Sequence, residues 1–337
     1  MLNLDEQRFL RIQSGALSLA GRLHETIGAC LATGAQNVFF LGAGGAGILM
    51  SPAVQLLHRS STFPTFSDIS AELVTAGHRS LGAKSLVVIS SLSGTTKESI
   101  AALDCCRKLG ATIMTLTGHA KTPLADAADH SFVNFAEDDT SCESFYLQSL
   151  IIALAIMDHR QEVADCRGIL DELARLPGLL LEVKRSQEAR AERLSETFRT
   201  EPYHIITGAG STWPQALYYG MCILEEMQWI RTRPVHASDF FHGTLELVEK
   251  GVSVVILKGE DTCRPLVERV ESFAPRFTDK VTVLDSAVFD LPGISARVRS
   301  LISPVLLATF LERMSAHLEV KRNHPLTTRR YYKRVAY

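Results

Sequence analysis

A strand-like run that ends in a glycine-rich turn occurs twice in this sequence, and this repeat constrains the fold more than any other feature. The segments NVFFLGAGGAG (37–47) and YHIITGAGSTW (203–213) each lead from an apolar run through Gly-Ala-Gly into small residues. Such self-similarity indicates two copies of one module. With 337 residues the chain is long enough for two domains of ordinary size. We therefore expect domains at residues 1–160 and 161–337.

Short apolar runs alternate with helical patterns in both halves of the chain. An N-terminal helical pattern ends at Gly34, and no strand-like run occurs from about residue 144 to 199, where Pro177-Gly178 should break a helical connection. Alternation of this kind is typical of βαβ crossovers with a parallel sheet buried on both faces. The predicted fold class is α/β, with two doubly wound domains that contain parallel sheets and are joined by a helical segment. Strands are expected at 37–41, 62–66, 85–90, 112–116, 131–135, 203–207, 252–257 and 280–284, followed by a helix at 299–320.

Charge and cysteine usage exclude several classes of partner. Lys plus Arg total 35 and Asp plus Glu total 37, a net charge of -2 that offers no basic footprint for nucleic acid. The seven cysteines form no CxxC pair and no Cys/His ligand spacing, so neither a disulfide framework nor a metal site is expected. The acidic N-terminus is unlike a signal peptide, and the longest apolar run, 149–157, is far shorter than the about 20 residues that span a bilayer. We expect a cytoplasmic protein without membrane segments.

The first glycine turn fits the dinucleotide-binding pattern GxGxxG over residues 42–47, and Asp68 follows at about the spacing of the acid that binds ribose. A nicotinamide or flavin site is therefore one alternative. A tight strand-to-helix turn without a ligand is another, because such a turn needs glycine where backbones approach closely. The residues alone leave both alternatives open.

A stronger signal is the hydroxyl-rich segment SSLSGTTKE (90–98), which follows the apolar run 85–89 and opens a helix. Hydroxyls and free amide N–H groups at a helix N-terminus form a cup for a phosphate dianion. The spacing is not that of a P-loop, so nucleoside triphosphates are not indicated. The alternative is a helix cap rich in Ser and Thr. The density of hydroxyls favours a phosphate site.

In these features the sequence resembles the sugar isomerase (SIS) domain family. Ser91, Ser93 and Thr96 stand at the three hydroxyl positions of the family's Ser-x-Ser-Gly-x-Thr phosphate loop. Ser70 and Glu72 stand in a segment that resembles the family's Ser-x-Glu-Phe. The resemblance implies that these five residues bind a sugar phosphate.

The same resemblance turns the first glycine turn from a cofactor fingerprint into a wall of the sugar site, with Gly44 and Gly45 as substrate-binding residues. Ala46 departs from the Ser or Thr usual in relatives, so one contact to a substrate hydroxyl is expected to be missing. Both halves together resemble the doubled SIS arrangement in the isomerase half of glucosamine-6-phosphate synthase. The chain begins Met-Leu, without the glutaminase cysteine at residue 1 or 2, so glutamine-driven synthesis is not expected.

The second half carries the catalytic part of the resemblance. It implies that Glu226 is the general base that moves a proton between C1 and C2, and that His242 assists ring opening and proton transfer at oxygen. The residues agree, because Glu226 has apolar neighbours that suit a base tuned by burial, whereas we expect Glu225 to face solvent. His236 is the main alternative to His242. The family also implies a homodimer whose His-Gly loop serves the site of the neighbouring subunit.

Three segments, 226–230, 239–243 and 324–337, most resemble the deglycases of fructosamine 6-phosphates, which are Amadori products. The implied reaction converts a 6-phosphorylated fructosyl- or glucosyl-amino acid, through an enaminol, to glucose 6-phosphate and a free amino acid. It needs no metal and no redox cofactor. Thr244 departs from the proline usual after His-Gly, which could alter how this loop enters the site.

The sequence also allows other interpretations of the tail and of the activity. The basic tail, with Arg329, Arg330, Lys333 and the carboxylate of Tyr337, could contact the amino-acid end of the substrate or could simply be solvated. The activity could instead be that of an aldose-ketose isomerase, or of a deaminase acting on glucosamine 6-phosphate. A non-catalytic sugar-phosphate-binding protein is a further alternative, although residues 1–36 are too few and insufficiently basic for the DNA-binding segment of SIS regulators.

Overall fold

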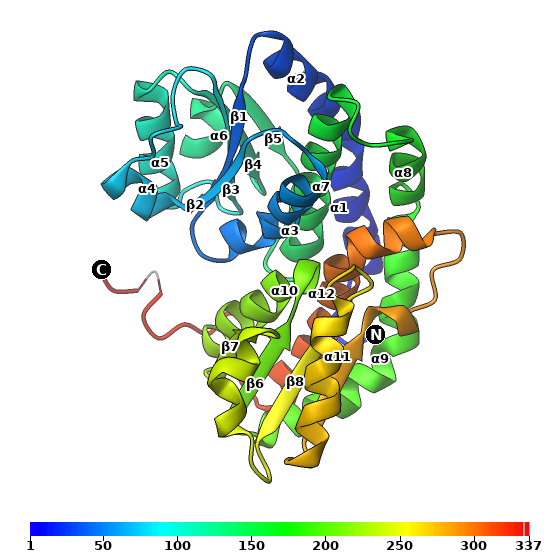
Figure 1. The fold of residues 1–337 in the computed structure, drawn as a ribbon. Coiled ribbons are helices and arrows are strands. Elements are labelled where there is room, and N and C mark those ends of the chain that lie inside the picture. The colour runs from blue at the N-terminus through cyan, green and yellow to red at the C-terminus, as the bar shows by residue number, and fades with distance from the viewer. Residues whose placement is uncertain (333, 337) are drawn as a thin grey trace. The chain divides into compact units, whose positions relative to one another are not determined.

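The computed structural model describes residues 1–332 and 334–336, and its backbone forms two compact units. The first unit contains Glu6–Pro177. The second contains Met1–Asp5 together with the chain from Gly178 onward. Each unit has its own parallel sheet, as the repeated motif predicts (Figure 1). The boundary between repeats expected after residue 160 remains a prediction, because units defined by packing need not follow the boundaries of a duplicated module.

The strands of the first unit form one parallel sheet. They are β1 (Asn37–Gly42), β2 (Thr65–Ile69), β3 (Ser85–Ser91), β4 (Thr112–Thr117) and β5 (His130–Val133). Their order is β2-β1-β3-β4-β5, and every residue of β3 is buried, as expected for a parallel sheet covered on both faces. All five predicted strands are confirmed. Strand β2 starts later than predicted because Pro64, which has no N–H to donate to the sheet, precedes it.

The helices of the first unit follow the predicted alternation. The single N-terminal helix expected from the apolar spacing is divided at Leu19, and the apolar run 149–157 lies in a helix buried along almost its whole length. Within the described residues, no helix combines the length and the apolar character needed to cross a lipid bilayer. The helices are α1 (Glu6–Ser18), α2 (Ala20–Ala32), α3 (Gly45–Ser60), α4 (Ser70–Ala76), α5 (Lys97–Lys108), α6 (Pro123–Ala127), α7 (Ser141–His159) and α8 (Cys166–Leu173).

The second unit has a four-stranded parallel sheet. Its strands are β6 (Tyr203–Gly208), β7 (Arg231–His236), β8 (Ser253–Lys258) and β9 (Val281–Asp285), in the order β7-β6-β8-β9. The prediction missed β7, which has polar residues, alternates in exposure and contains Pro234. This strand lies at the edge of the sheet, where a proline is tolerated and only one side pairs with another strand.

Helices also connect the strands of the second unit. The helical connection is broken slightly earlier than predicted, because α8 ends at Leu173 and α9 begins at Leu176. Pro177 and Gly178 lie in the first turn of α9, where the missing N–H of proline costs no helical hydrogen bond. The helix predicted at 299–320 is confirmed within α12. The α-helices are α9 (Leu176–Thr200), α10 (Trp213–Tyr218), α11 (Arg264–Phe273) and α12 (Ala296–Lys321). The π-helix is η2 (Tyr219–Glu225), and the short 3₁₀ helices are η1 (Gly210–Thr212), η3 (Asp239–His242), η4 (Thr244–Leu247), η5 (Ala274–Arg276) and η6 (Ser286–Val288).

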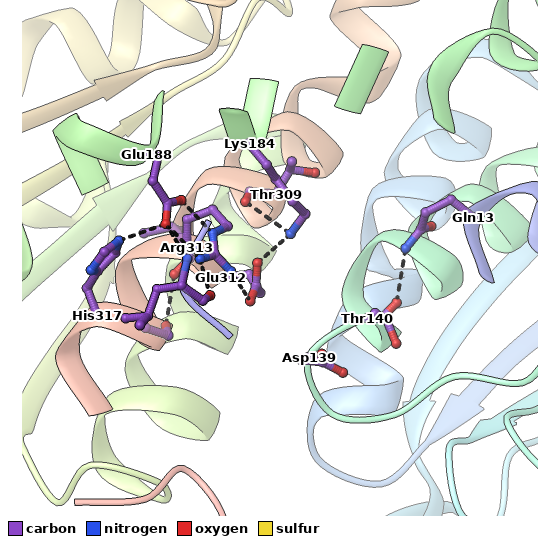
Figure 2. Close-up of polar contacts among 12 residues, drawn as sticks. Gln13, Asp139, Thr140, Lys184, Glu188, Thr309, Glu312, Arg313 and His317 are labelled. Carbon is purple, nitrogen blue, oxygen red and sulfur yellow. Dashed lines mark hydrogen bonds and ion pairs between the residues drawn. The ribbon is translucent and has the colours of Figure 1, made fainter. Parts of the chain in front are cut away.

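A group of ion pairs fastens the first residues of the chain to α9 and α12 within the second unit (Figure 2). The fully buried Arg313 donates to both oxygens of Glu188, at 2.8 and 2.9 Å, and to the carbonyl of Leu2 at 2.5 Å. Burial opposes ionisation of Glu188, but hydrogen bonds from Arg313 and from the Leu2 N–H lower its pKa to about 2. The buried Lys184 pairs in the same way with Glu312, at 2.5 Å. Residues 1–5 belong to this unit, because the Leu2 backbone completes the hydrogen bonds of Glu188 and Arg313.

Candidate active site

The loops after β1, β2 and β3 meet at the carboxyl edge of the first sheet. Gly42, the last residue of β1, pairs with Ile69 at the end of β2 and with Ser90 near the end of β3. The strand order reverses direction between β1 and β3. In open parallel sheets, ligands bind in the crevice at such a switch point. The fold therefore brings the first glycine turn and the hydroxyl-rich loop together where a ligand is expected.

The glycine turn after β1 has a packing reason for its composition. A Cβ atom on Gly42 would lie 2.4 Å from the Cα of Gly47, so the two backbones touch. Gly44 and Gly45 stand at the N-terminus of α3, and Ala46 accepts a hydrogen bond from Ser90 Oγ at its carbonyl, at 2.8 Å. This bond joins the glycine turn to the hydroxyl-rich loop. Close packing of the turn therefore explains the glycine spacing without a dinucleotide.

The hydroxyl-rich loop after β3 gathers its side chains at the N-terminus of α5. Ser91 Oγ and Thr96 Oγ1 share a hydrogen bond of 3.0 Å, and Ser91 Oγ also accepts from the Gly94 N–H at 3.1 Å. Ser93 Oγ accepts from the hydroxyl and the N–H of Thr95, at 3.0 and 3.3 Å. The first amides of a 12-residue helix lie just beyond, where the helix dipole favours an anion. This arrangement suits a phosphate dianion.

Gly94 gives this loop its shape. Its φ is +63°, and a Cβ atom there would lie 2.1 Å from Thr122 Oγ1. The Gly94 carbonyl also accepts a hydrogen bond from the Leu124 N–H, at 3.1 Å. The loop is therefore held against the start of α6 by a contact that only glycine permits.

Ser70 and Glu72 stand at the start of α4, directly after β2, at the same edge of the sheet. The Ser70 side chain is fully buried, and its Oγ finds no hydrogen-bond partner among residues 1–332 and 334–336. The Glu72 side chain is exposed. The structure thus places both predicted residues beside the two loops, and a direct role in binding stays a prediction.

The equivalent switch point of the second unit already holds a carboxylate. Strand order reverses there between β6 and β8, and Asp261 comes from the loop after β8. Its Oδ2 accepts from the N–H and the hydroxyl of Ser211 in the second glycine turn, at 2.7 and 2.6 Å, and its Oδ1 accepts from the Cys263 N–H at 2.8 Å. Sequence analysis did not select Asp261. Because the chain's own anion occupies these donors, the second glycine turn is unsuited to a phosphate.

Glu226 follows the π-helix η2 in the second unit. The N–H of Glu226 donates to the carbonyl of Met221, five residues earlier, and π-helical turns of this kind often occur at functional sites. Glu225 is exposed and accepts from the hydroxyl of Thr232 at 2.6 Å. Glu226 is half-buried instead, and its Oε1 lies 2.9 Å from Nε of Arg329. The outward orientation predicted for Glu225 is confirmed, whereas the contact between Glu226 and Arg329 was not predicted.

The basic tail is fastened to the segment that carries Glu226. Gln228 Nε2 donates to the carbonyl of His324 at 2.7 Å, and the His324 ring meets the Trp229 ring edge-on, with centroids 4.5 Å apart. The Arg330 guanidinium lies 4.0 Å above the centre of the Trp229 ring. The tail up to Tyr332 is therefore not a freely solvated extension. Lys333 and Tyr337, which were also predicted to contact substrate, lie outside the described residues.

The two candidate histidines differ in their surroundings. His236, at the end of β7, is half-buried, and its Nδ1 accepts from the Ser238 N–H at 3.2 Å. His242 is exposed at the end of η3, and no hydrogen bond of its ring is found within the described residues. The unusual Thr244 is buried, and its hydroxyl accepts from Arg233 Nε at 3.1 Å. Of these two residues, His242 is the more exposed.

Cys222, four residues before Glu226, is not suited to act as a nucleophile. Burial, together with the charges of Glu226 and Glu225, raises the pKa of the Cys222 thiol to about 12, so it is not a nucleophile at neutral pH. All seven cysteines lie in the described part of the chain and are free thiols. In that part of the chain, no three His, Cys, Asp or Glu side chains are grouped to hold a metal ion.

Two α/β units, each with a parallel sheet, and a hydroxyl-rich loop at the switch point of one of them are typical of a class of sugar-phosphate proteins. The SIS domain family matches residues 33–158, which covers the glycine turn and the hydroxyl-rich loop. The chain belongs to the SIS-domain phosphosugar isomerase family.

Relatives match both units. The fructosamine deglycase FrlB of Bacillus subtilis is 31% identical over 90% of this chain and 93% of its own. A fructoselysine 6-phosphate deglycase of Escherichia coli O157:H7 is 28% identical over 88% of this chain and 85% of its own. A solved structure from Bacillus subtilis, provisionally described as a phosphosugar isomerase, superposes with a TM-score of 0.87 at 28% identity, covering 96% of this chain and 99% of that one. The predicted family and the predicted pair of SIS-type domains are thereby confirmed.

Proposed function

We propose that this protein is a deglycase that hydrolyses a 6-phosphorylated fructosamine to glucose 6-phosphate and a free amino acid. The observation that carries the proposal is the similarity to FrlB along nearly the whole chain, which includes both the hydroxyl-rich loop and Glu226. Relatives that match most of the chain are named as deglycases, and a phosphate loop together with a half-buried glutamate suits this reaction.

The two units divide the work in this proposal. Ser91, Ser93 and Thr96 of the first unit hold the phosphate with the first amides of α5. The backbone of Gly44 and Gly45 lines the sugar in this proposal. Ser70 and Glu72, at the same edge of the sheet, are further proposed contacts to the sugar. The second unit does not bind the phosphate in this proposal, because Asp261 occupies the donors of its glycine turn. It contributes proton transfer through Glu226 instead.

Proton transfer prepares the C–N bond for hydrolysis. Glu226 removes a proton from C1 of the open-chain ketose, the electron pair forms a C1–C2 double bond, and the C2 carbonyl opens as its oxygen takes up a proton, which gives an enaminol. Return of a proton to C2 converts the enaminol to an imine between C1 and the nitrogen. Water adds to C1 of the imine, and the amino acid leaves with its nitrogen protonated, so one water is consumed for each substrate. His242 is proposed to move protons at the sugar oxygens during ring opening.

We also propose that the active protein is a homodimer in which the His242 loop serves the site of the neighbouring subunit. The exposed ring of His242, which makes no hydrogen bond within the described residues of its own chain, supports this arrangement. The assembly would then need two copies of the chain for each complete site.

Product analysis tests the activity itself. The protein is incubated with 6-phosphofructosyl amino acids and, separately, with glucosamine 6-phosphate, and glucose 6-phosphate, fructose 6-phosphate and ammonia are measured. The proposal expects glucose 6-phosphate from the fructosyl compounds. Release of ammonia from glucosamine 6-phosphate, without any activity on the fructosyl compounds, would contradict it in favour of a deaminase.

Replacing Glu226 by Gln tests the base. We expect kcat to fall by about 10²–10⁴-fold, the usual contribution of a general base, with little change in the binding of sugar phosphate. Glu225→Gln is the matched control, because the neighbouring carboxylate is exposed and bonds only locally to Thr232. Near-normal turnover in Glu226→Gln, or an equal loss in both variants, would remove Glu226 from this role.

A further inference from the structure

Arg329 holds the carboxylate that the proposed mechanism needs as a base. Its Nε lies 2.9 Å from Glu226 Oε1, and only 12% of its side chain is exposed. The Nη1 group of the same guanidinium donates to the carbonyls of Leu326 and Thr328, at 2.5 and 3.1 Å. Backbone carbonyls therefore orient the guanidinium, and its Nε edge is directed at a carboxylate.

The tail carrying Arg329 is fixed in place independently of this ion pair. The Leu326 N–H donates to Glu319 Oε1 in α12 at 3.1 Å, and Gln228 holds the carbonyl of His324 at 2.7 Å. Arg330 lies over Trp229. Arg329 would therefore keep its position if Glu226 moved away from it.

The ion pair conflicts with the proposed role of Glu226. A guanidinium beside a carboxylate favours the charged form, so the carboxylate takes up a proton less readily. A base held in this way is weak, and one of its oxygens is already engaged. Glu226 would become a stronger base if another anion took its place on Arg329.

The substrate of the proposed function carries such an anion, because its amino acid has an α-carboxylate. We propose that Arg329 is a specificity-determining residue that binds this α-carboxylate and thereby releases Glu226 for proton removal. The inference rests on the proposed function. Arginine is the side chain best matched to a carboxylate, which it can bind with two parallel hydrogen bonds. The substrate class is then a 6-phosphofructosyl amino acid with a free α-carboxylate, and an amine lacking it leaves the base paired.

Two synthetic substrates that differ in a single charge test this inference. They are 6-phosphofructosyl-glycine and 6-phosphofructosyl-glycinamide, and kcat/KM is measured for both. Wild type should prefer the glycine compound by about 10–100-fold, as expected for a charge-assisted hydrogen bond. Arg329→Gln should lower kcat/KM for the glycine compound and maintain or raise it for the glycinamide compound, so that the preference approaches one. Arg334→Gln, at an exposed arginine of the same tail, should keep the wild-type preference.

A pH profile distinguishes positioning of the base from a merely structural role. With the glycinamide compound, the acidic limb of kcat/KM should lie at higher pH in Arg329→Gln than in wild type, because the carboxylate has lost its cation. Arg329→Lys covers the case in which the glutamine variant does not fold. It keeps the charge but not the planar fork, and it should retain a reduced preference for the glycine compound.

Several results would overturn the inference. Equal use of the two compounds by wild type is one, and equal losses on both compounds in Arg329→Gln is another. If wild type turns over no 6-phosphofructosyl amino acid, the proposed deglycase function fails, and specificity is read from binding instead. The glycine compound should then raise the melting temperature of wild type more than the glycinamide compound does, and Arg329→Gln should abolish the difference. Equal stabilisation of wild type by both compounds would sink the role of Arg329 as well.

Discussion

His204 is a fully buried imidazole in the core of the second unit. Its Nδ1 lies 2.8 Å from Ser253 Oγ, and its ring stacks on that of Phe198, with centroids 4.3 Å apart. Burial lowers the pKa of His204 to about 4, although the charge of Glu201 acts in the opposite direction. The folded protein therefore keeps this ring neutral at a pH where an unfolded chain would protonate it.

Stability should consequently fall on mild acidification. The ordinary pKa of histidine is 6.5, so between pH 6.5 and about 4 the unfolded chain binds a proton that the folded chain does not. The contribution of this residue is complete above pH 6.5 and is lost as the pH falls, by up to about 3 kcal/mol. Urea unfolding at pH 7.5 and pH 5 measures it. His204→Phe should lose less stability between the two pH values than wild type, and an equal loss would contradict the assignment.

The hydroxyl-rich loop is the element on which phosphate binding depends. Ser93→Ala combined with Thr96→Ala removes two hydroxyl donors, and each hydrogen bond to a charged group contributes about 1.5–3 kcal/mol. We expect KM to rise at least tenfold, which corresponds to a loss of about 1.4 kcal/mol or more in binding free energy, with a smaller effect on kcat. Ser211→Ala, in the glycine turn already filled by Asp261, is the control and should leave KM unchanged. Equal effects of the two changes would show that the first loop has no special role.

Strands that are continuous apolar runs were predictable from sequence, whereas the polar edge strand β7 was not. Strands β3 and β8 are continuous apolar runs because parallel sheets bury both faces, so composition alone identifies them. Strand β7 pairs on one side only and contains Pro234, which weakens every strand signal it has. Pro177 illustrates a small error of position, since the same residue that breaks a helix interior is well tolerated in a first turn.

The candidate site was predictable where its chemistry is local in sequence. Ser91, Ser93 and Thr96 occur in one loop at a strand end, and a short pattern reveals them. The contact between Arg329 and Glu226 joins segments far apart in the chain. The π-helix before Glu226 has a different number of residues per turn from an α-helix, so the regular helical period does not predict which way its side chains point. Such contacts need the folded chain.

At the scale of the molecule, the two units have similar sheet topology and unequal chemistry. Both sheets reverse strand order at the same position, yet hydroxyls gather in the loop after β3 at one switch point, whereas Asp261 accepts from the backbone of the glycine turn at the other. The first unit is therefore suited to phosphate, whereas the second has Asp261 in place of a hydroxyl-rich loop after its third strand. The second unit keeps Glu226 and His242 for proton transfer in the proposed mechanism.

Mixed dimers test whether sites are shared between subunits. Glu226→Gln and His242→Asn should each be almost inactive alone. If each site takes Glu226 from one chain and His242 from the other, random pairing of the two variants restores one site in half of the dimers, or roughly a quarter of wild-type activity. Co-expression with two affinity tags isolates the mixed dimer for assay. Mixed dimers that are no more active than their parents would place both residues in the site of a single chain.

The ion pairs around Arg313 have a consequence for the order in which the chain is completed. Leu2 is separated from Glu188 by 186 residues and from Arg313 by 311 residues, although all three belong to the second unit. During synthesis, residues 1–5 must remain undocked while the first unit emerges and folds, because their partners do not yet exist. The segment that is synthesised first is thus among the last to dock in the second unit. A gene divided between the two units would therefore yield a second fragment in which Arg313 keeps Glu188 but lacks the carbonyl of Leu2.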